Sequence, residues 1–331
     1  MAFPSELVTN RRLADCSTAP AKTIDMPVIK RLLIGLDLSS NDDHLIEYAA
    51  FLARRVQAEK AFFIHVIQKD DEDIELDRLQ AAGEQEHHSL EETVRRRMQA
   101  EIDKHFAYLA CEAHLELKDG NVAQSLLTWT RYIEPDLLLM GMKNAPDDYS
   151  KVPSNVVRLI NRPMMLIPVD TPKRLHKVVV ATDFSQYTAE CIDEVRLLAD
   201  PEDYRILLAH AYRLPSGYHR SGKSEREFCR IMEDNARKKA DEFFDEYDID
   251  PTHIELEVIQ ADDSKAAAIG KRAHEIQADL LVMGSRGRTQ IAEFLLGSTA
   301  AKFINLHLNI PLLIVKNRKG SMDFLDALRN I

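Results

Sequence analysis

The chain is poor in the residues that define several protein classes. Four cysteines occur among 331 residues, and their wide spacing lacks the C-x-x-C or metal-ligand patterns of disulfide frameworks and zinc sites. They are Cys16, Cys111, Cys191 and Cys229. We therefore expect reduced thiols and a cytoplasmic protein. We expect no metal site built on these residues and no cysteine nucleophile.

Long apolar runs and a basic charge balance are also missing. No apolar run approaches the roughly 20 residues that span a bilayer, and residues 1–27 lack the apolar core of a secretory signal. The formal net charge is −11, which argues against a general nucleic-acid binder because phosphate backbones require a basic surface. We expect a loosely held leader at 1–27 and neither a nucleic-acid nor a membrane partner. A hydrophobic content of 45% still allows two domains with real cores.

Glycine is scarce, with 11 residues in the chain, yet three glycines form one ordered motif near the C-terminal end. Gly284, Gly287 and Gly297 follow the frame G-x2-G-x9-G-S between an apolar strand-like segment at 279–283 and a helix-like segment that begins at Ser298. A loop in this position presents backbone N–H groups without side chains in the way, and the helix dipole favours an anion. The expected ligand is a phosphate group.

Two further segments accompany this frame. The run VVVATDFS at 178–185 reads as a first strand that ends in an acidic residue, and PLLIVK at 311–316 reads as a last strand opened by proline. Together with the glycine frame, these segments resemble the universal stress protein family, in the subgroup that binds adenine nucleotide. The resemblance covers about residues 30–316 and is strongest in the second half.

The same order of segments is written twice along the chain. The first copy opens with LLIGLDLS at 32–39 and the second with the 178–185 run, and both end in Asp-x-Ser. Further strands are expected at 61–67, 114–117, 136–140 and from 163, and at 205–212, 254–259, 279–283 and from 311. Helices are expected at 44–56, 89–109 and 122–133, and at 188–199, 225–247 and 264–277. Strands that alternate with helices predict parallel sheets covered on both faces.

We predict an α/β protein with two tandem, open, doubly wound, five-stranded parallel-sheet domains, which the resemblance assigns to the adenine nucleotide alpha hydrolase-like type. The first domain is expected at 28–170, a linker at 171–176 and the second domain at 177–318. A tail helix is expected at 319–331, where apolar residues recur at helical spacing. Family members commonly pair through their fifth strands, so the resemblance implies an intrachain pseudo-dimer. A homodimer of whole chains stays open.

The first half has lost the glycine frame. After its fourth strand it reads GMKNAPDD at 141–148, and it is acidic after strands two and four, where the second half is basic. The acidic residues are Asp70, Asp71, Glu72, Asp73, Asp147 and Asp148, and the basic ones are Arg213, Arg220, Lys223, Arg286 and Arg288. Because like charges repel, we predict one nucleotide per chain, held in the second half. The alternative is that both sets of charges are solvated faces.

The resemblance also implies roles for individual residues at the carboxyl edge of the second sheet, where strand order reverses. Asp183, after Ala181 and Thr182, would accept hydrogen bonds from adenine and ribose. The alternative for Asp183 is a turn residue or helix cap. Backbone groups around Ala211 would meet the adenine edge, and Met283 with Gly284 would form the pocket floor. The phosphates would be met by Arg286, Gly287, Arg288, Gly297, Ser298 and Thr299.

A second phosphate motif competes with this interpretation. Residues 217–224, GYHRSGKS, satisfy the P-loop pattern G-x4-G-K-[ST]. Four residues separate this motif from the preceding strand, and the bulky residues at 218–220 fill places where a phosphate cradle is tight. One alternative is therefore a P-loop-like enzyme that hydrolyses ATP. In a mixed alternative, Arg220 or Lys223 folds over phosphates held by the glycine frame.

The resulting hypothesis is a universal stress protein that binds ATP, ADP or AMP, with Mg²⁺ as an optional companion, and acts in stress response or signalling. No general base or metal cage for fast turnover is apparent, so slow ATP hydrolysis or autophosphorylation is the most that we expect. We interpret His210 as an interior or edge residue of a strand. A scaffold that binds no nucleotide is the remaining alternative.

Overall fold

The computed structural model describes residues 28–67, 90–142, 152–215, 217–218, 222–285, 298–306 and 308–316. The first half contains β1 (Arg31–Leu36), α1 (Asp42–Val56), β2 (Lys60–Ile67), α3 (Leu90–Phe106), β3 (Glu112–Asp119), α4 (Val122–Ile133), β4 (Leu137–Met142), α5 (Val152–Leu159) and β5 (Met164–Pro168). The second half contains β6 (Lys177–Ala181), α6 (Gln186–Leu198), β7 (Arg205–Tyr212), α7 (Glu225–Glu246), β8 (Ile254–Gln260), α8 (Lys265–Glu275), β9 (Leu280–Gly284), α9 (Ser298–Ile304) and β10 (Leu312–Val315). The predicted leader and tail helix lie outside these residues.

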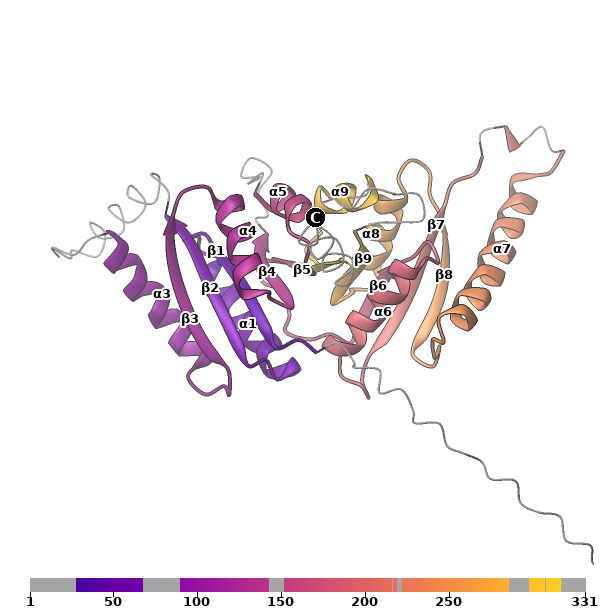
Figure 1. Cartoon of the computed structure of the whole chain (residues 1–331). Coiled ribbons are helices and arrows are strands. Elements are labelled where there is room, and N and C mark those ends of the chain that lie inside the picture. Colours follow the sequence, from indigo (N-terminus) through magenta and orange to yellow (C-terminus); the bar gives the residue numbers. More distant parts are fainter. Residues whose placement is uncertain are drawn as a thin grey trace, which may run out of the picture.

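The strands form one sheet that runs through both halves. Its order is β3-β2-β1-β4-β5-β10-β9-β6-β7-β8, with ten strands. Within each half the strands are parallel, and the halves meet where β5 pairs antiparallel with β10, with Leu313 opposite Met165. Figure 1 shows the halves side by side, with α3 and α7 at the outer ends. The α/β fold and the pairing of the fifth strands are therefore confirmed.

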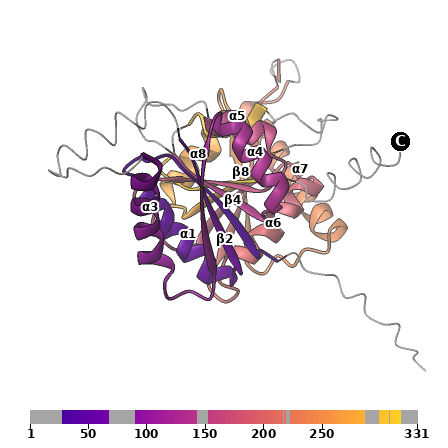
Figure 2. The same ribbon diagram turned by 60° about the vertical axis from the view of Figure 1, so that its left-hand side comes forward.

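Each face of the sheet carries one apolar core that both halves share. Along β1, Leu32 and Ile34 belong to one core and Leu33 to the other, because successive strand side chains point to opposite faces. The first core is covered by α1, α3, α6 and α7, and the second by α4, α5, α8 and α9. In the first half, Figure 2 shows α1 and α3 on one side of the strands and α4 and α5 on the other. None of the described helices is long and apolar enough to cross a bilayer.

A buried aspartate aligns the starting ends of neighbouring strands. The Oδ2 atom of Asp279 accepts hydrogen bonds from the backbone N–H groups of His176 (3.0 Å) and Lys177 (2.9 Å), and so places the start of β6 beside β9. Asp136 binds the start of β1 in the same way. The sequence pattern placed Asp136 and Asp279 at the first positions of their strands. In the structure each aspartate lies one residue before its strand, β4 or β9, and its side chain binds the backbone at the start of the neighbouring strand.

The predicted linker, residues 171–176, is held against the first half. Thr171 is buried, and its N–H donates to His44 Nε2 at 3.0 Å. Nearby, Arg55 Nη1 lies 3.0 Å from Asp200 Oδ2 and joins the end of α1 to the loop after α6. These contacts supplement the strand pairing between the halves.

Candidate functional site

The carboxyl edge of the second half brings together three of the segments that the sequence singled out. In the sheet, β6 lies between β9 and β7, so the residues after β6 have the end of β9 on one side and the end of β7 on the other. These segments contain Ala181 at the end of β6, Thr182 and Asp183 after it, Ala211 on β7, and Met283 and Gly284 on β9. This is the point at which successive connections reverse direction, where α/β folds bind ligands.

Asp183 lies in a tight turn between β6 and α6. Its Oδ1 atom accepts hydrogen bonds from the N–H of Ser185 (3.2 Å) and from the hydroxyl of Thr188 (3.4 Å). Thr182 Oγ1 accepts the N–H of Phe184 at 2.9 Å, and Phe184 has a φ of 58°, in the left-handed region. The carboxylate of Asp183 thus has the turn role that the sequence left open as an alternative. A nucleotide contact for this half-buried side chain stays a prediction.

A histidine on β7 supports this turn, and the same arrangement recurs in the first half. His210 Nδ1 lies 3.1 Å from the carbonyl oxygen of Thr182, so it must be the protonated nitrogen, because a carbonyl only accepts. Burial lowers the pKa of His210, and its ring stacks on Phe184 with centroids 4.7 Å apart. His65 contacts the carbonyl oxygen of Leu36 at the same distance, 3.1 Å. The shared position of the two histidines in the repeats was a signal that the sequence interpretation did not use.

The end of β9 leaves a small residue beside this turn. Met283 is buried, Gly284 is half-buried, and the N–H of Ser285 donates to Val315 O at 2.9 Å, which fixes the strand end against β10. Across the edge, the hydroxyl oxygen of Ser185 is buried without a hydrogen-bond partner among the described residues. At the equivalent edge of the first half, the amide oxygen of Asn41 is likewise buried without a hydrogen-bond partner among the described residues.

Much of the predicted phosphate loop lies outside the described residues, namely Arg286, Gly287, Arg288 and Gly297. Ser298 and Thr299 open α9, so the predicted start of a helix at Ser298 agrees with the structure. Arg220 is also outside the described residues, whereas Lys223 is described and exposed. The acidic segments 70–73 and 147–148 of the first half are likewise not described.

Ser224, the last residue of the P-loop-like motif at 217–224, caps the start of a helix. Ser224 precedes α7 and forms a capping box with Glu227: the Ser224 N–H donates to Glu227 Oε2 at 2.8 Å, and Ser224 Oγ accepts the Glu227 N–H at 3.3 Å. The same hydroxyl lies 2.7 Å from Glu227 Oε2. In a P-loop this hydroxyl binds the metal ion. Here it is engaged by a carboxylate of its own helix.

The corresponding edge of the first half is acidic and filled by its own side chains. The carboxylate of Asp42 accepts the N–H groups of Asp37 (3.2 Å) and Leu38 (2.8 Å). Burial, and then the neighbouring Asp37 carboxylate, raise the pKa of Asp42 to about 8. Asn41 is 6% exposed, and its Nδ2 atom lies 2.7 Å from where a Cβ on Gly141 would stand. In the first half, an amide therefore packs on Gly141, the glycine equivalent to Gly284.

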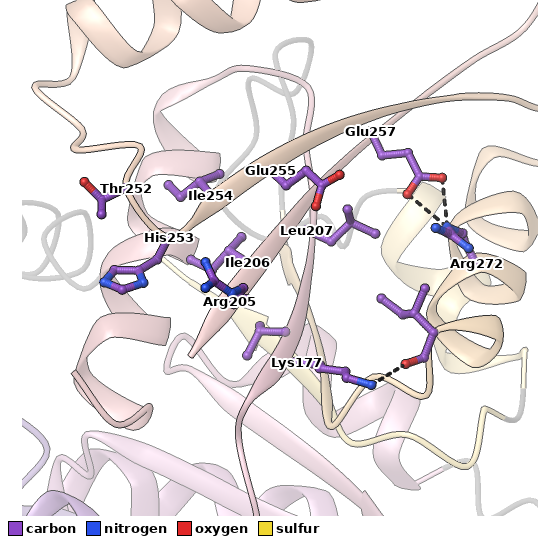
Figure 3. A pocket seen from close by; sticks show the side chains of 12 residues that line it. Lys177, Arg205, Ile206, Leu207, Thr252, His253, Ile254, Glu255, Glu257 and Arg272 are labelled. Atoms are coloured by element: carbon purple, nitrogen blue, oxygen red, sulfur yellow. Dashed lines mark hydrogen bonds and ion pairs between the residues drawn. The ribbon is translucent and has the colours of Figure 1, made fainter. Parts of the chain in front are cut away.

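The described cavity drawn in Figure 3 lies at the opposite edge of the second half. Its volume is about 240 Å³, and it lies at the starts of β6, β7 and β8, where its lining includes Lys177 and Arg205. Two of its cations already have partners: Arg272 Nε lies 2.8 Å from Glu257 Oε1, and Lys177 Nζ donates to Ile276 O at 3.3 Å. None of the predicted nucleotide residues lines this cavity.

Comparison with known proteins agrees with this geometry. The model of the universal stress protein family matches the chain twice, at residues 29–168 and 174–316. A protein of unknown function from Pseudomonas aeruginosa PAO1 is similar in structure with a TM-score of 0.60 and 14% identity, and the alignment covers 92% of this chain and 99% of that one. A universal stress protein from Archaeoglobus fulgidus is similar with a TM-score of 0.57 and 18% identity, over 88% and 97%.

A universal stress protein solved in complex with cAMP covers 44% of this chain and 100% of its own, with a TM-score of 0.31 and 14% identity. This likeness is too weak to bear on binding by the present chain. No curated protein matches the sequence. The two family matches together span most of the 331 residues. The chain therefore belongs to the universal stress protein family and contains two family domains in tandem.

Proposed function

We propose that the second half binds one adenine nucleotide, ATP, ADP or AMP, and that the chain acts as a nucleotide-dependent protein of stress response or signalling. The observation that carries this proposal is the contrast between the two equivalent edges. At the second edge, the carboxylate of Asp183 accepts a hydrogen bond from the hydroxyl of Thr188. At the first edge, Asp42 stands at the position of Thr188, and the amide of Asn41 packs on Gly141, the glycine equivalent to Gly284.

Charge supports the same choice of half. A nucleotide brings two or more negative charges, and the Asp37–Asp42 pair already raises the pKa of Asp42 above its usual range. Because Asp42 keeps its proton until about pH 8, the repulsion on a phosphate at neutral pH would come from Asp37, and the phosphate would hold the proton on Asp42 more strongly. The sequence places Arg286 and Arg288 in the loop of the second half, where a helix N-terminus would also favour phosphate.

The same residues decide how Mg²⁺ would be held and whether the site could hydrolyse the nucleotide. Mg²⁺ would be held mainly by the phosphates of the nucleotide, because this ion usually keeps several waters and takes one or two carboxylates. Asp183 is the carboxylate of the described edge that would be nearest to it. Nothing else in the described edge supplies a general base, so we expect binding with little or no turnover.

The test is a calorimetric titration of the whole chain with ATP and with AMP, each with and without Mg²⁺. We expect one site per chain. Asp183→Asn should weaken binding by roughly 10-fold to 100-fold, the effect of losing a hydrogen bond to a charged group. The matched variant Asp37→Asn in the first half should leave binding unchanged. If Asp37→Asn weakens binding and Asp183→Asn does not, the nucleotide binds in the first half and the proposal fails.

Two further variants separate the competing hypotheses. Gly297→Val places a branched side chain in the glycine frame and should abolish binding, whereas Lys223→Ala should have a small effect. A large loss with Lys223→Ala alone would favour the P-loop alternative, and phosphate release with measurable turnover would favour an enzyme. Mass spectrometry of small molecules released from denatured protein identifies the nucleotide, and protein that neither carries nor binds one is a scaffold.

A further inference from the structure

Three metal-ligating side chains meet between α1 and α3 in the first half. Asp43, Glu101 and His105 each offer one ligand atom, and these atoms lie within 4.8 Å of one another. The closest pair is His105 Nε2 and Asp43 Oδ1 at 2.9 Å. We call these three residues the α1–α3 cluster.

The geometry of this cluster follows from helix periodicity and packing. Glu101 and His105 are four residues apart on α3, so they lie on the same face of that helix. Asp43 faces them from the first turn of α1, which packs against α3. The side chain of His105 is only 15% exposed, so its imidazole is held in place by its surroundings. To bind an ion, His105 Nε2 must give up the proton that it donates to Asp43 Oδ1.

The donor set fits a particular class of metal. One imidazole nitrogen and two carboxylate oxygens suit Zn²⁺ and its neighbours in the first transition row, whereas Mg²⁺ and Ca²⁺ prefer oxygen alone. Zn²⁺ sites with three protein ligands keep a fourth position for water. The ligand pair contributed by one helix and the third ligand from another would fix the metal on both helices.

A lysine already holds the carboxylates of the cluster. Lys104 Nζ lies 3.1 Å from Asp43 Oδ1 and 3.2 Å from Glu101 Oε2, the same groups that would bind the ion. The Lys104 side chain is 56% exposed, so it can leave without disturbing the core.

The second half lacks this arrangement, which makes it an internal comparison. The repeats align Asp37 with Asp183, so Asp43 corresponds to Ala189 in the first turn of α6. Ala189 has no ligand atom. The described residues of the second half therefore have no counterpart of Asp43 at this position.

We propose that the α1–α3 cluster binds one divalent transition metal ion, such as Zn²⁺, and that the ion clamps α3 to α1. Lys104 competes with the metal for the two carboxylates. The site is separate from the nucleotide proposed for the second half. It would make the stability of the first half depend on metal supply.

The test uses the full chain, stripped with EDTA and titrated with Zn²⁺ alone by calorimetry. We expect one site, weakened at least 10-fold by His105→Ala. Lys104→Met should instead bind Zn²⁺ more tightly than the wild type, several-fold or more, because it removes the competing ammonium. A cluster that serves only as a network of ion pairs predicts no such gain.

The matched control is His114→Ala, since His114 Nε2 contacts a single carboxylate, Glu112, at 3.5 Å. This variant should bind Zn²⁺ like the wild type. Co²⁺ replaces Zn²⁺ in a parallel titration, and its absorption spectrum reveals any thiolate ligand. Absence of Zn²⁺ binding, binding that survives His105→Ala, or a thiolate spectrum would each overturn the proposal. Circular dichroism confirms that each variant is folded.

Discussion

Asp42 makes the stability of the first half depend on pH in a direction opposite to that of most aspartates. Its pKa rises from 3.8 to about 8, first because of burial and second because of Asp37. In the unfolded chain Asp42 releases its proton near pH 4, whereas in the fold it keeps the proton until about pH 8. Folding therefore takes up a proton in this window. Stability falls as pH rises through it and levels off above it.

The magnitude follows from the width of this window. One group contributes at most about 1.4 kcal/mol per pH unit, and the pKa change is from 3.8 to about 8. The ceiling for the full window is thus about 6 kcal/mol. Between pH 5 and pH 8, we expect Asp42→Asn to gain about 2–4 kcal/mol of unfolding free energy relative to the wild type, because the amide stays neutral throughout.

The assay is urea unfolding of the wild type and Asp42→Asn at several pH values in EDTA, so that metal binding does not interfere. The neighbouring Asp43 provides a control with the opposite sign, because contacts with His105 and Lys104 lower its pKa to about 2. Its stabilising contribution is present above pH 4 and is lost as pH falls toward 2. If the difference between Asp42→Asn and the wild type is the same at pH 5 and pH 8, Asp42 is ionised in the fold and the reasoning is wrong.

Three other contacts are tested by substitutions and urea unfolding. Asp279→Asn should cost about 3 kcal/mol, because the side chain of Asp279 is 2% exposed and pairs with Arg174 at 2.5 Å. Arg174→Gln should cost about 1 kcal/mol, since Arg174 is half-exposed, and an additive double mutant would contradict this pairing. Gly141→Ala should cost about 1–3 kcal/mol because its Cβ would stand 2.7 Å from Asn41 Nδ2, and a further Asn41→Ser change should recover most of this loss. Leu313→Ala, at the pairing of β5 with β10, should cost about 2–5 kcal/mol, and a loss below 0.5 kcal/mol would mean that the seam is not part of the core.

The fold could be predicted from the sequence because its apolar patterns are local and occur in both halves. The apolar run at 178–181 alternates between the two cores along β6, and the same pattern opens the first half at β1. Element ends were less predictable, since the carboxylate of Asp279 binds backbone groups that lie 102 and 103 residues earlier in the chain. Such long-range contacts leave no periodic trace in the sequence. They are decided by which strands become neighbours.

The candidate site was predictable in position and less so in detail. Asp183 and Gly284 come directly after strands that the sequence identified, and strand adjacency brings them to one edge. The turn bonds of Asp183 and the support from His210 depend on side-chain packing, which spacing alone does not specify. The α1–α3 cluster is a similar case, because His105 and Asp43 lie 62 residues apart.

The shared cores place the same structural requirement on both halves, whatever lies at their carboxyl edges. At the seam, Met164, Met165, Leu166 and Ile167 are fully buried, as are the residues of β10 that they meet. A half on its own would expose this apolar strand edge, which invites pairing with another chain. Covering that edge requires only that β5 keep its apolar side chains and its direction, and neither property involves the carboxyl edge of the sheet. The seam therefore constrains β5 of the first half independently of the residues at its carboxyl edge, such as Asp42.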